Sequence, residues 1–201
     1  MPEISFNLDL SHTPVLIGVI ALVIWNLTER LLHNIFRLRQ PKSSQKERLS
    51  SYLCGLSWYS AVIFSLLDAT GFHWTTISPS LSSICYAGIP FLVVGIAVRL
   101  VSRFTLGKQF SSHVQTTESH RLITSGIYSA IRHPAYLGYL CLLIGFPICF
   151  GSIAGFVCAF AAGIPALIYR IWIEEIALLQ WFGVEYQQYQ KITSRLIPLL
   201  W

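Results

Sequence analysis

Long uncharged stretches dominate the chain and predict its secondary structure. Asp, Glu, Lys and Arg are absent from four of them: 10–28, 49–67, 69–98 and 134–169. A helix that crosses about 30 Å of hydrocarbon needs about 20 residues, so the first two stretches each predict one membrane span. The third begins with turn-forming residues and leaves a span over roughly 81–98, whereas the fourth is too long for one helix. Pro147, Gly151 and Ser152 near its middle predict a hairpin of two spans that turns around 147–152.

These patterns predict an all-α integral membrane protein with five transmembrane helices. The composition agrees, because 54% of the 201 residues are hydrophobic, only 11% are charged, and the mean hydropathy is +0.58. Soluble domains carry about 25% charged residues. Lipid is therefore the expected surrounding of most of the chain.

Basic residues indicate the orientation of these spans. With the amino terminus outside, all 14 Lys and Arg residues fall on one face, while Glu3, Asp9 and Asp68 fall on the other. Positive charge is enriched on the cytoplasmic side of membrane proteins, so we expect the basic face to be cytosolic. The membrane would be a bacterial inner membrane or the endoplasmic reticulum, depending on the source. This topology explains the net charge of +5 without a nucleic-acid partner.

Five cysteines lie in or beside the apolar stretches: Cys54, Cys85, Cys141, Cys149 and Cys158. They form no CxxC pair and have no His at a spacing typical of metal sites. We therefore expect them to pack within the helices, and we expect no metal site.

Two polar segments flank the predicted hairpin. Residues 103–133 interleave His, Gln and Tyr with Leu and Ile, which is richer in hydrogen-bonding groups than a simple loop requires. In residues 170–201 apolar positions recur every three to four residues, which predicts an amphipathic helix that continues the last span. Because both segments adjoin one hairpin, we expect them to be neighbours on the cytosolic face.

Several residues at the ends of the hairpin carry candidate chemistry. Pro134 suits a first helical turn, where N–H groups have no internal partner, and such a helix end attracts an anion or a polar ligand beside His133. Arg170 and Glu174 are four residues apart and so share one helix face. A structural interpretation is also open, in which Arg170 pairs with Glu174 and snorkels to the headgroups and His133 is an ordinary interfacial histidine. Arg132 is expected to anchor the helix end at the headgroups.

Two long motifs stand in order at the two ends of the hairpin: HRLITSGIYSAIRHPAYLG at 120–138 and RIWIEEIALLQWFGVEYQQYQKITSRLIP at 170–198. Together they resemble the isoprenylcysteine carboxyl methyltransferase family, within the wider group that includes membrane phospholipid methyltransferases. The resemblance covers roughly residues 105–198. It implies that S-adenosylmethionine binds at helix ends on the cytosolic face, and that a lipidic acceptor, such as a prenylated cysteine, enters from the bilayer among the membrane lipids.

The uncharged stretches and the resemblance together predict a division of the chain, and the resemblance implies a set of binding residues. Residues 1–102 would supply three helices with a basic cytosolic loop, and 103–201 a catalytic core with the helical hairpin and a cytosolic carboxy-terminal helix. Arg170 would bind the anionic group of the acceptor and form the catalytic pair with Glu174. The residues implied to contact S-adenosylmethionine are Gln115, His120, Arg121, Leu122, Ile123, Tyr128, His133, Pro134, Ala135, Tyr136 and Glu174.

Charge explains how such a site would work. The methyl group of a sulfonium is already activated, so its transfer depends mainly on positioning. A carboxylate acceptor is ionised at neutral pH and needs no general base, and a guanidinium such as that of Arg170 can hold it in a planar, bidentate grip. Glu174 would balance the positive charge of the cofactor.

Two other functions fit the general pattern. A phospholipid or small-lipid N-methyltransferase would need a base for its amine acceptor, and no obligatory arginine. A non-enzymatic membrane protein that binds lipid would leave the polar set of His120, Tyr128, His133 and Glu174 unexplained. No feature of the sequence specifies an oligomeric state.

Overall fold

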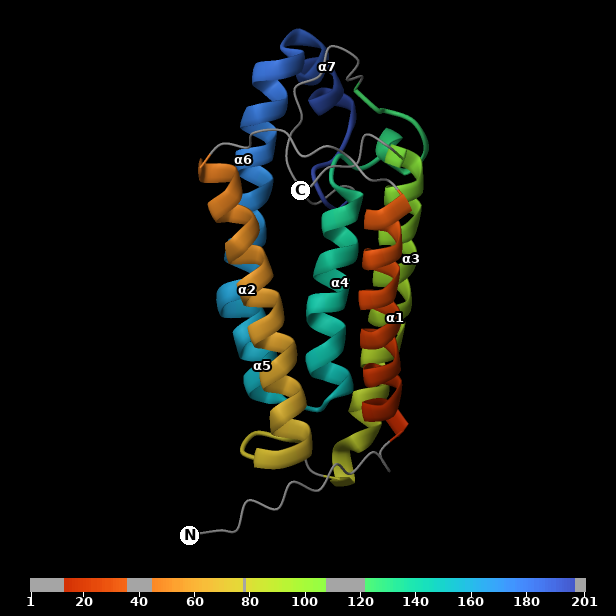
Figure 1. The fold of residues 1–201 in the computed structure, drawn as a ribbon, viewed down its shortest axis with the longest axis vertical. Coiled ribbons are helices and arrows are strands. Elements are labelled where there is room, and N and C mark those ends of the chain that lie inside the picture. Colours follow the sequence, from red (N-terminus) through yellow and green to blue (C-terminus); the bar gives the residue numbers. More distant parts are fainter. Residues whose placement is uncertain (1–12, 36–44, 78, 108–121, 198–201) are drawn as a thin grey trace.

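Helices form the bundle that the hydropathy pattern predicts. The computed structural model describes residues 13–35, 45–77, 79–107 and 122–197. Its α-helices are α1 (Thr13–Ile35), α2 (Gln45–Leu67), α3 (Gly88–Leu106), α4 (Pro134–Cys149), α5 (Ile153–Cys158), α6 (Ile164–Phe182) and α7 (Val184–Ile192). Short π-helical or 3-10 segments lie between them: η1 (Asp68–Phe72), η2 (Pro79–Ala87), η4 (Gly126–Ser129) and η5 (Ala159–Gly163). Figure 1 shows α1 to α6 side by side along the long axis of the molecule, so the all-helical prediction is confirmed.

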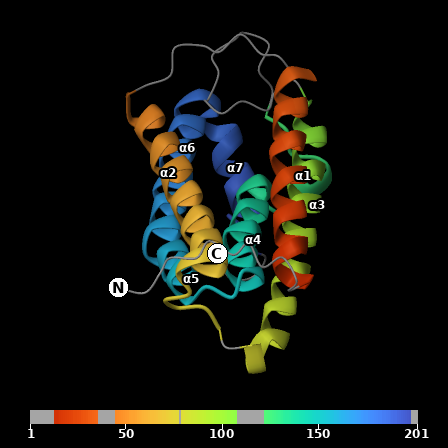
Figure 2. The same ribbon diagram turned by 60° about the horizontal axis from the view of Figure 1, so that its bottom comes forward.

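Among the described residues, four helical segments are long and apolar enough to cross a membrane: Thr13–Leu32, Gln45–Phe72, Ser83–Leu106 and Ile153–Phe182. The other predicted span, α4, is apolar but has only 16 residues, about 24 Å of helix. It lies among the longer helices (Figures 1 and 2), and small residues let it approach α3 closely. A Cβ atom added at Gly138 would lie 2.8 Å from the carbonyl oxygen of Gly95. The multi-pass membrane architecture is confirmed, while the fifth span stays a prediction.

The chain turns between α4 and α5 at 150–152, inside the predicted range of 147–152. Gly151 has a φ angle of +64° there, a conformation that glycine adopts without steric cost. The Ser152 hydroxyl caps α5 by accepting a hydrogen bond from the Gly155 N–H group at 3.1 Å. From this turn α5, η5 and α6 form one long helical segment, which extends past the apolar stretch as the amphipathic pattern predicts.

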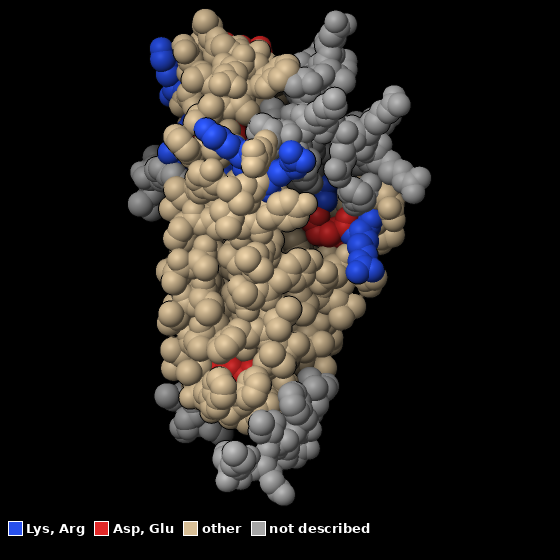
Figure 3. All heavy atoms as spheres, turned by 60° about the vertical axis from the view of Figure 1, so that its left-hand side comes forward, with Lys and Arg blue, Asp and Glu red and all other residues tan. Residues whose placement is uncertain are grey.

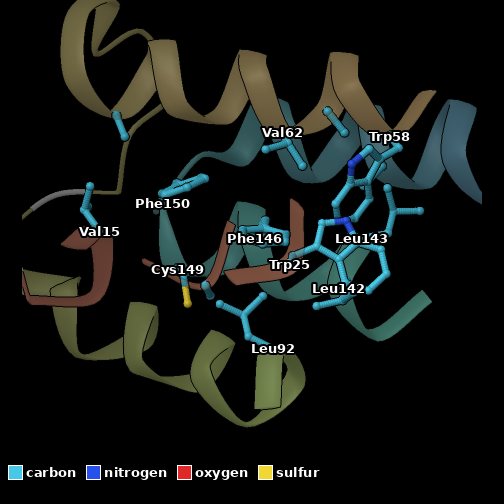
Figure 4. Close-up of a cluster of buried hydrophobic side chains, with 14 residues drawn as sticks. Val15, Trp25, Trp58, Val62, Leu92, Leu142, Leu143, Phe146, Cys149 and Phe150 are labelled. Atoms are coloured by element: carbon cyan, nitrogen blue, oxygen red, sulfur yellow. The ribbon is translucent and has the colours of Figure 1, made fainter. Parts of the chain in front are cut away.

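Buried apolar side chains from α1 to α4 meet in a central cluster (Figure 4). Phe146 of α4 contacts the ring of Trp58 of α2 edge-on, with 5.4 Å between the ring centroids. Trp58 in turn lies 5.9 Å from the ring of Trp25 of α1. Large apolar side chains elsewhere, such as Leu56 and Val93, are exposed on the outside. The bundle is therefore packed at its centre and apolar on its surface, as a protein solvated by lipid tails must be.

The two ends of the bundle differ in charge. The basic end, where α2 and α4 begin and α1, α3 and α6 end, comprises residues 29–35, 45–50, 99–107, 122–136 and 170–197. The turn end comprises η1 with the residues after it (68–77) and the turn at 150–153 (Figure 2). Figure 3 shows Lys and Arg side chains near one end of the molecular face it displays, above a long surface that is almost entirely free of charged side chains apart from a small acidic patch in its lower part. Both motif-bearing segments belong to the basic end.

Candidate active site

Most of the residues that the resemblance implies come together at the basic end. Gln115, His120 and Arg121 lie outside the described residues. The others belong to three elements: Leu122 and Ile123 precede η4, which carries Tyr128; His133, Pro134, Ala135 and Tyr136 begin α4; Arg170 and Glu174 lie in α6. Side-chain hydrogen bonds join Tyr136, Arg170 and Glu174. Leu122 and Ile123 have no polar side-chain groups and take no part in this bonding.

Arg170 is buried, and two neighbouring helices hold its guanidinium. The residue is only 5% exposed. Nε donates to the Tyr136 hydroxyl at 3.0 Å, while Nη1 donates to the Glu47 carbonyl oxygen at 3.1 Å and to the Ser50 hydroxyl at 3.0 Å. The snorkelling interpretation is therefore wrong, because a snorkelling side chain keeps its charge in water. The site also includes α2, which lies outside both motifs.

Tyr136 of α4 joins Arg170 to Glu174 of α6. Its hydroxyl accepts a hydrogen bond from Arg170 Nε and donates one to the Glu174 carboxylate. A phenol has a single O–H proton. Because Arg170 can only donate, the Tyr136 O–H proton points to the Glu174 carboxylate. The pair of opposite charges on one face of α6 is thus bridged by a side chain of the adjacent helix.

Glu175, which the sequence argument did not select, pairs with three basic side chains. Its Oε1 atom lies 3.0 Å from Arg132 Nε and 3.3 Å from His133 Nε2, and its Oε2 atom lies 2.8 Å from Arg195 Nη2. The Arg132 side chain is 8% exposed and also donates to the Gln190 carbonyl at 3.1 Å. The expectation that Arg132 anchors the helix at the headgroups is therefore wrong. In the sequence, the only sign of this cluster was that a second glutamate, Glu175, directly follows Glu174 in the motif.

The start of α4 is bonded within the protein. Pro134 lies in the first turn after His133, as predicted. The N–H groups of Tyr136 and Leu137 both donate to the His133 carbonyl oxygen, at 3.0 and 3.1 Å. The Leu137 bond is the regular first bond of the helix, so the expectation that the first N–H groups stay free for an anion is wrong for Tyr136. The His133 N–H group itself donates to the Arg195 carbonyl at 3.1 Å, which ties the carboxy-terminal segment to this helix end.

Arg99 of α3 supports the same helix end from the other side. Its Nη1 atom donates to the Ala135 carbonyl at 3.2 Å, and its Nε atom pairs with Glu29 Oε1 of α1 at 2.8 Å. The guanidinium also lies 5.0 Å from the ring centroid of Trp25, a favourable cation–π distance. Helices α1 and α3 therefore help to fix the position of the motif residues in α4.

Three tyrosines also lie at the basic end: Tyr128 before α4, and Tyr186 and Tyr189 in α7. The Tyr189 hydroxyl of α7 donates to the Tyr128 carbonyl at 2.5 Å. Tyr186 is 1% exposed, and its hydroxyl has no hydrogen-bond partner among the described residues. Burial raises the pKa of both Tyr128 and Tyr186, so both hydroxyls stay protonated at neutral pH. A buried donor without a partner is uncommon in a folded protein.

Comparison with known proteins identifies the family. A model of the isoprenylcysteine carboxyl methyltransferase (ICMT) family matches residues 88–180, from α3 into α6. The chain is 31% identical over 175 residues to the protein-S-isoprenylcysteine O-methyltransferase of Homo sapiens. This match covers 81% of this chain and 58% of the human protein. It is 30% identical over 160 residues to protein-S-isoprenylcysteine O-methyltransferase A of Arabidopsis thaliana, covering 76% of this chain and 79% of the plant protein.

A solved structure has the same general fold. It is the eukaryotic intramembrane Ras methyltransferase ICMT, which matches with a TM-score of 0.60 at 23% identity over 90% of this chain and 64% of that chain. This chain thus spans less than two thirds of the human relative and of the solved structure. The sequence matches, the order of the two motifs and the membrane fold agree: the chain belongs to the isoprenylcysteine carboxyl methyltransferase family of membrane methyltransferases.

Proposed function

We propose that this protein transfers the methyl group of S-adenosylmethionine to the carboxylate of a lipidic acceptor, such as a prenylated cysteine. One observation carries the proposal: the buried Arg170 guanidinium and the Glu174 carboxylate share the Tyr136 hydroxyl. A guanidinium is suited to bind a carboxylate acceptor, and a carboxylate is suited to bind a cationic cofactor. The two relatives above are both named protein-S-isoprenylcysteine O-methyltransferases, which supports this class of acceptor.

The polar groups at the basic end fit the cofactor. Glu174 is half-buried and supplies a negative charge for a cationic molecule, and the buried Tyr186 hydroxyl supplies a donor that needs a partner. S-adenosylmethionine, when bound, supplies a sulfonium methyl group that needs no further activation. We assign its contacts to the residues of the family motifs: Gln115, His120, Arg121, Leu122, Ile123, Tyr128, His133, Pro134, Ala135, Tyr136 and Glu174.

Within this proposal, Arg170 and Glu174 are the catalytic pair. Arg170 binds the acceptor carboxylate and directs one of its oxygens, and no general base is required because the carboxylate is already ionised. Burial of the guanidinium strengthens this attraction, since charges interact more strongly away from bulk water. Tyr136 keeps the two charged side chains aligned. Most of the rate acceleration comes from this positioning.

We further propose that the basic end faces the cytosol and that the amino terminus lies outside. The one-sided placement of Lys and Arg supports this orientation. α4 would be the fifth span, enclosed by longer helices and flanked by polar segments. Residues 1–102 would then supply three spans and the basic loop, and residues 103–201 the catalytic core. The acceptor and membrane lipids would reach the site from the bilayer, in a bacterial inner membrane or the endoplasmic reticulum.

A labelling experiment tests the proposed reaction. Purified protein in detergent is incubated with methyl-labelled S-adenosylmethionine and farnesylcysteine, geranylgeranylcysteine or phosphatidylethanolamine. We expect label on a prenylcysteine that is released by base, because methyl esters hydrolyse. Base-stable label on phosphatidylethanolamine would instead indicate N-methylation. Absence of both label transfer and cofactor binding would favour a non-enzymatic, lipid-binding role.

A further inference from the structure

Ser50 of α2 contacts Arg170 of α6 across 120 positions of the sequence. It is completely buried, near the start of α2 at the basic end. Its hydroxyl donates to the Glu47 carbonyl at 2.9 Å and accepts from Arg170 Nη1 at 3.0 Å. Because the hydroxyl proton points to Glu47, the oxygen presents a lone pair to the guanidinium.

The guanidinium of Arg170 is therefore held from two helices at once. Nη1 has two N–H groups, and these donate to the Ser50 hydroxyl and the Glu47 carbonyl on α2. Nε donates to Tyr136 on α4. Since the group is planar and rigid, these three bonds together restrict its plane and the direction in which it faces.

We propose that Ser50 is a positioning residue that sets the direction in which Arg170 meets the carboxylate of the acceptor. The inference rests on the proposed function of Arg170. Without the Ser50 hydroxyl, Arg170 keeps its charge and its bonds to Tyr136 and Glu47, but Nη1 loses one of its two acceptors on α2, so the guanidinium is held less tightly in one direction. An ionised carboxylate, which depends on the direction of the N–H groups, loses more from this loosening than a neutral methyl ester. Ser50 therefore contributes to the discrimination between substrate and product.

Ser57 provides a matched control in the same helix. It lies two helical turns after Ser50 and is also buried. Its hydroxyl donates to the Cys54 carbonyl at 3.0 Å, three residues earlier, as the Ser50 hydroxyl does to Glu47. Ser50→Ala and Ser57→Ala thus remove the same local bond from the same helix, but only Ser50→Ala removes a partner of Arg170.

The test compares a carboxylate with its ester. Dissociation constants of farnesylcysteine and of farnesylcysteine methyl ester are measured by competition in detergent for the wild-type protein and both variants, together with the dissociation constant of S-adenosylmethionine. Because hydrogen bonds to charged groups are the stronger ones, Ser50→Ala should weaken carboxylate binding about 10-fold. Binding of the ester and of the cofactor should change less than about twofold, and Ser57→Ala should change none of the three.

Three results would overturn the inference. They are an unchanged preference for the carboxylate in Ser50→Ala, an equal loss in Ser57→Ala, and an equal weakening of carboxylate, ester and cofactor. If Ser50→Ala does not accumulate as folded protein, Ser50→Cys has nearly the same size but only a weak donor and acceptor, and it carries the same expectations. A different result would contradict the proposed function itself: the wild-type protein would not prefer farnesylcysteine to its methyl ester and would not methylate a prenylcysteine.

Discussion

The turn end and the basic end both bury charge, but they satisfy it in different ways. At the turn end Asp68 is 1% exposed, and the donors that bond its carboxylate within the described part of the chain are neutral. Oδ1 accepts from the N–H groups of Trp74 and Thr75 at 2.9 and 3.1 Å. Oδ2 accepts from the hydroxyls of Thr75 and Ser152 at 2.6 and 2.7 Å. The carboxylate thereby ties the segment after α2 to the turn before α5.

At the basic end, charged groups share their partners across several elements. Glu175 of α6 is shared by Arg132, His133 and Arg195, and the Tyr136 hydroxyl is shared by Arg170 and Glu174. A carboxylate surrounded by neutral donors stabilises one arrangement of the loops around it. A chain of shared charged groups can exchange a partner for a ligand. We therefore propose a structural role for the turn end and a chemical role for the basic end.

The largest effect on folding is expected for Glu175→Gln. This change leaves the buried Arg132 guanidinium without its carboxylate, and breaking a buried ion pair on one side costs about 3 to 5 kcal/mol of unfolding free energy. The measurement is denaturant unfolding in detergent, beside Glu174→Gln, which alters the adjacent residue of the same helix. A loss no larger for Glu175→Gln than for Glu174→Gln would contradict the role of Glu175 as the centre of the cluster.

Arg170→Lys is expected to have the largest effect on catalysis. Lysine keeps the positive charge but lacks the planar fork that Ser50, Tyr136 and an acceptor carboxylate require. The rate of methyl transfer should fall about 100- to 1,000-fold, while the dissociation constant of S-adenosylmethionine stays within about threefold of its wild-type value. Both quantities are measured on one preparation. Wild-type turnover in Arg170→Lys, with a base-stable product, would favour the N-methyltransferase alternative.

Glu174→Gln is expected to act mainly on the cofactor. It removes a charge-assisted contact worth about 1.5 to 3 kcal/mol, which corresponds to about 10- to 150-fold in affinity. Calorimetric titration with S-adenosylmethionine measures the change. An unchanged affinity would mean that Glu174 serves only as the partner of Tyr136.

The smallest effect is expected for Asp68→Asn at the turn end. An amide keeps one oxygen for the N–H groups of Trp74 and Thr75, so the free energy of unfolding should fall by only about 1 to 2 kcal/mol. Cofactor affinity and methyl transfer should be unchanged, because the contacts of Asp68 belong to the other end of the bundle. A selective loss of cofactor affinity in Asp68→Asn would refute the division of roles between the two ends.

Much of the fold was predictable because lipid imposes simple requirements on the sequence. Uncharged stretches and the Pro147 to Ser152 turn formers located the helices and the hairpin. The close packing of α4 was less predictable. It depends on how closely Gly138 approaches Gly95 of α3 and on enclosure by the other helices, neither of which is visible in a charge-free stretch of 36 residues at 134–169.

The candidate site was predictable only where a motif carried it. The two motifs predicted Tyr136, Arg170 and Glu174 as site residues, and in the structure hydrogen bonds connect their side chains. Ser50 could not be predicted, since a serine in an apolar helix gives no signal and its contact with Arg170 spans 120 positions. Arg132 was misassigned because a basic residue next to a membrane helix usually faces the headgroups. Here the Glu175 carboxylate and backbone carbonyls hold it instead.

Photolabelling tests the division between the two ends most directly. Protein in detergent is irradiated with methyl-labelled S-adenosylmethionine, with and without excess S-adenosylhomocysteine, and the labelled peptides are identified by mass spectrometry. The account predicts label in peptides from 122–136 or 170–190 at the basic end, and its loss in the presence of the competitor. Label confined to 68–77 or 150–153 at the turn end, or label that the competitor does not reduce, would contradict it.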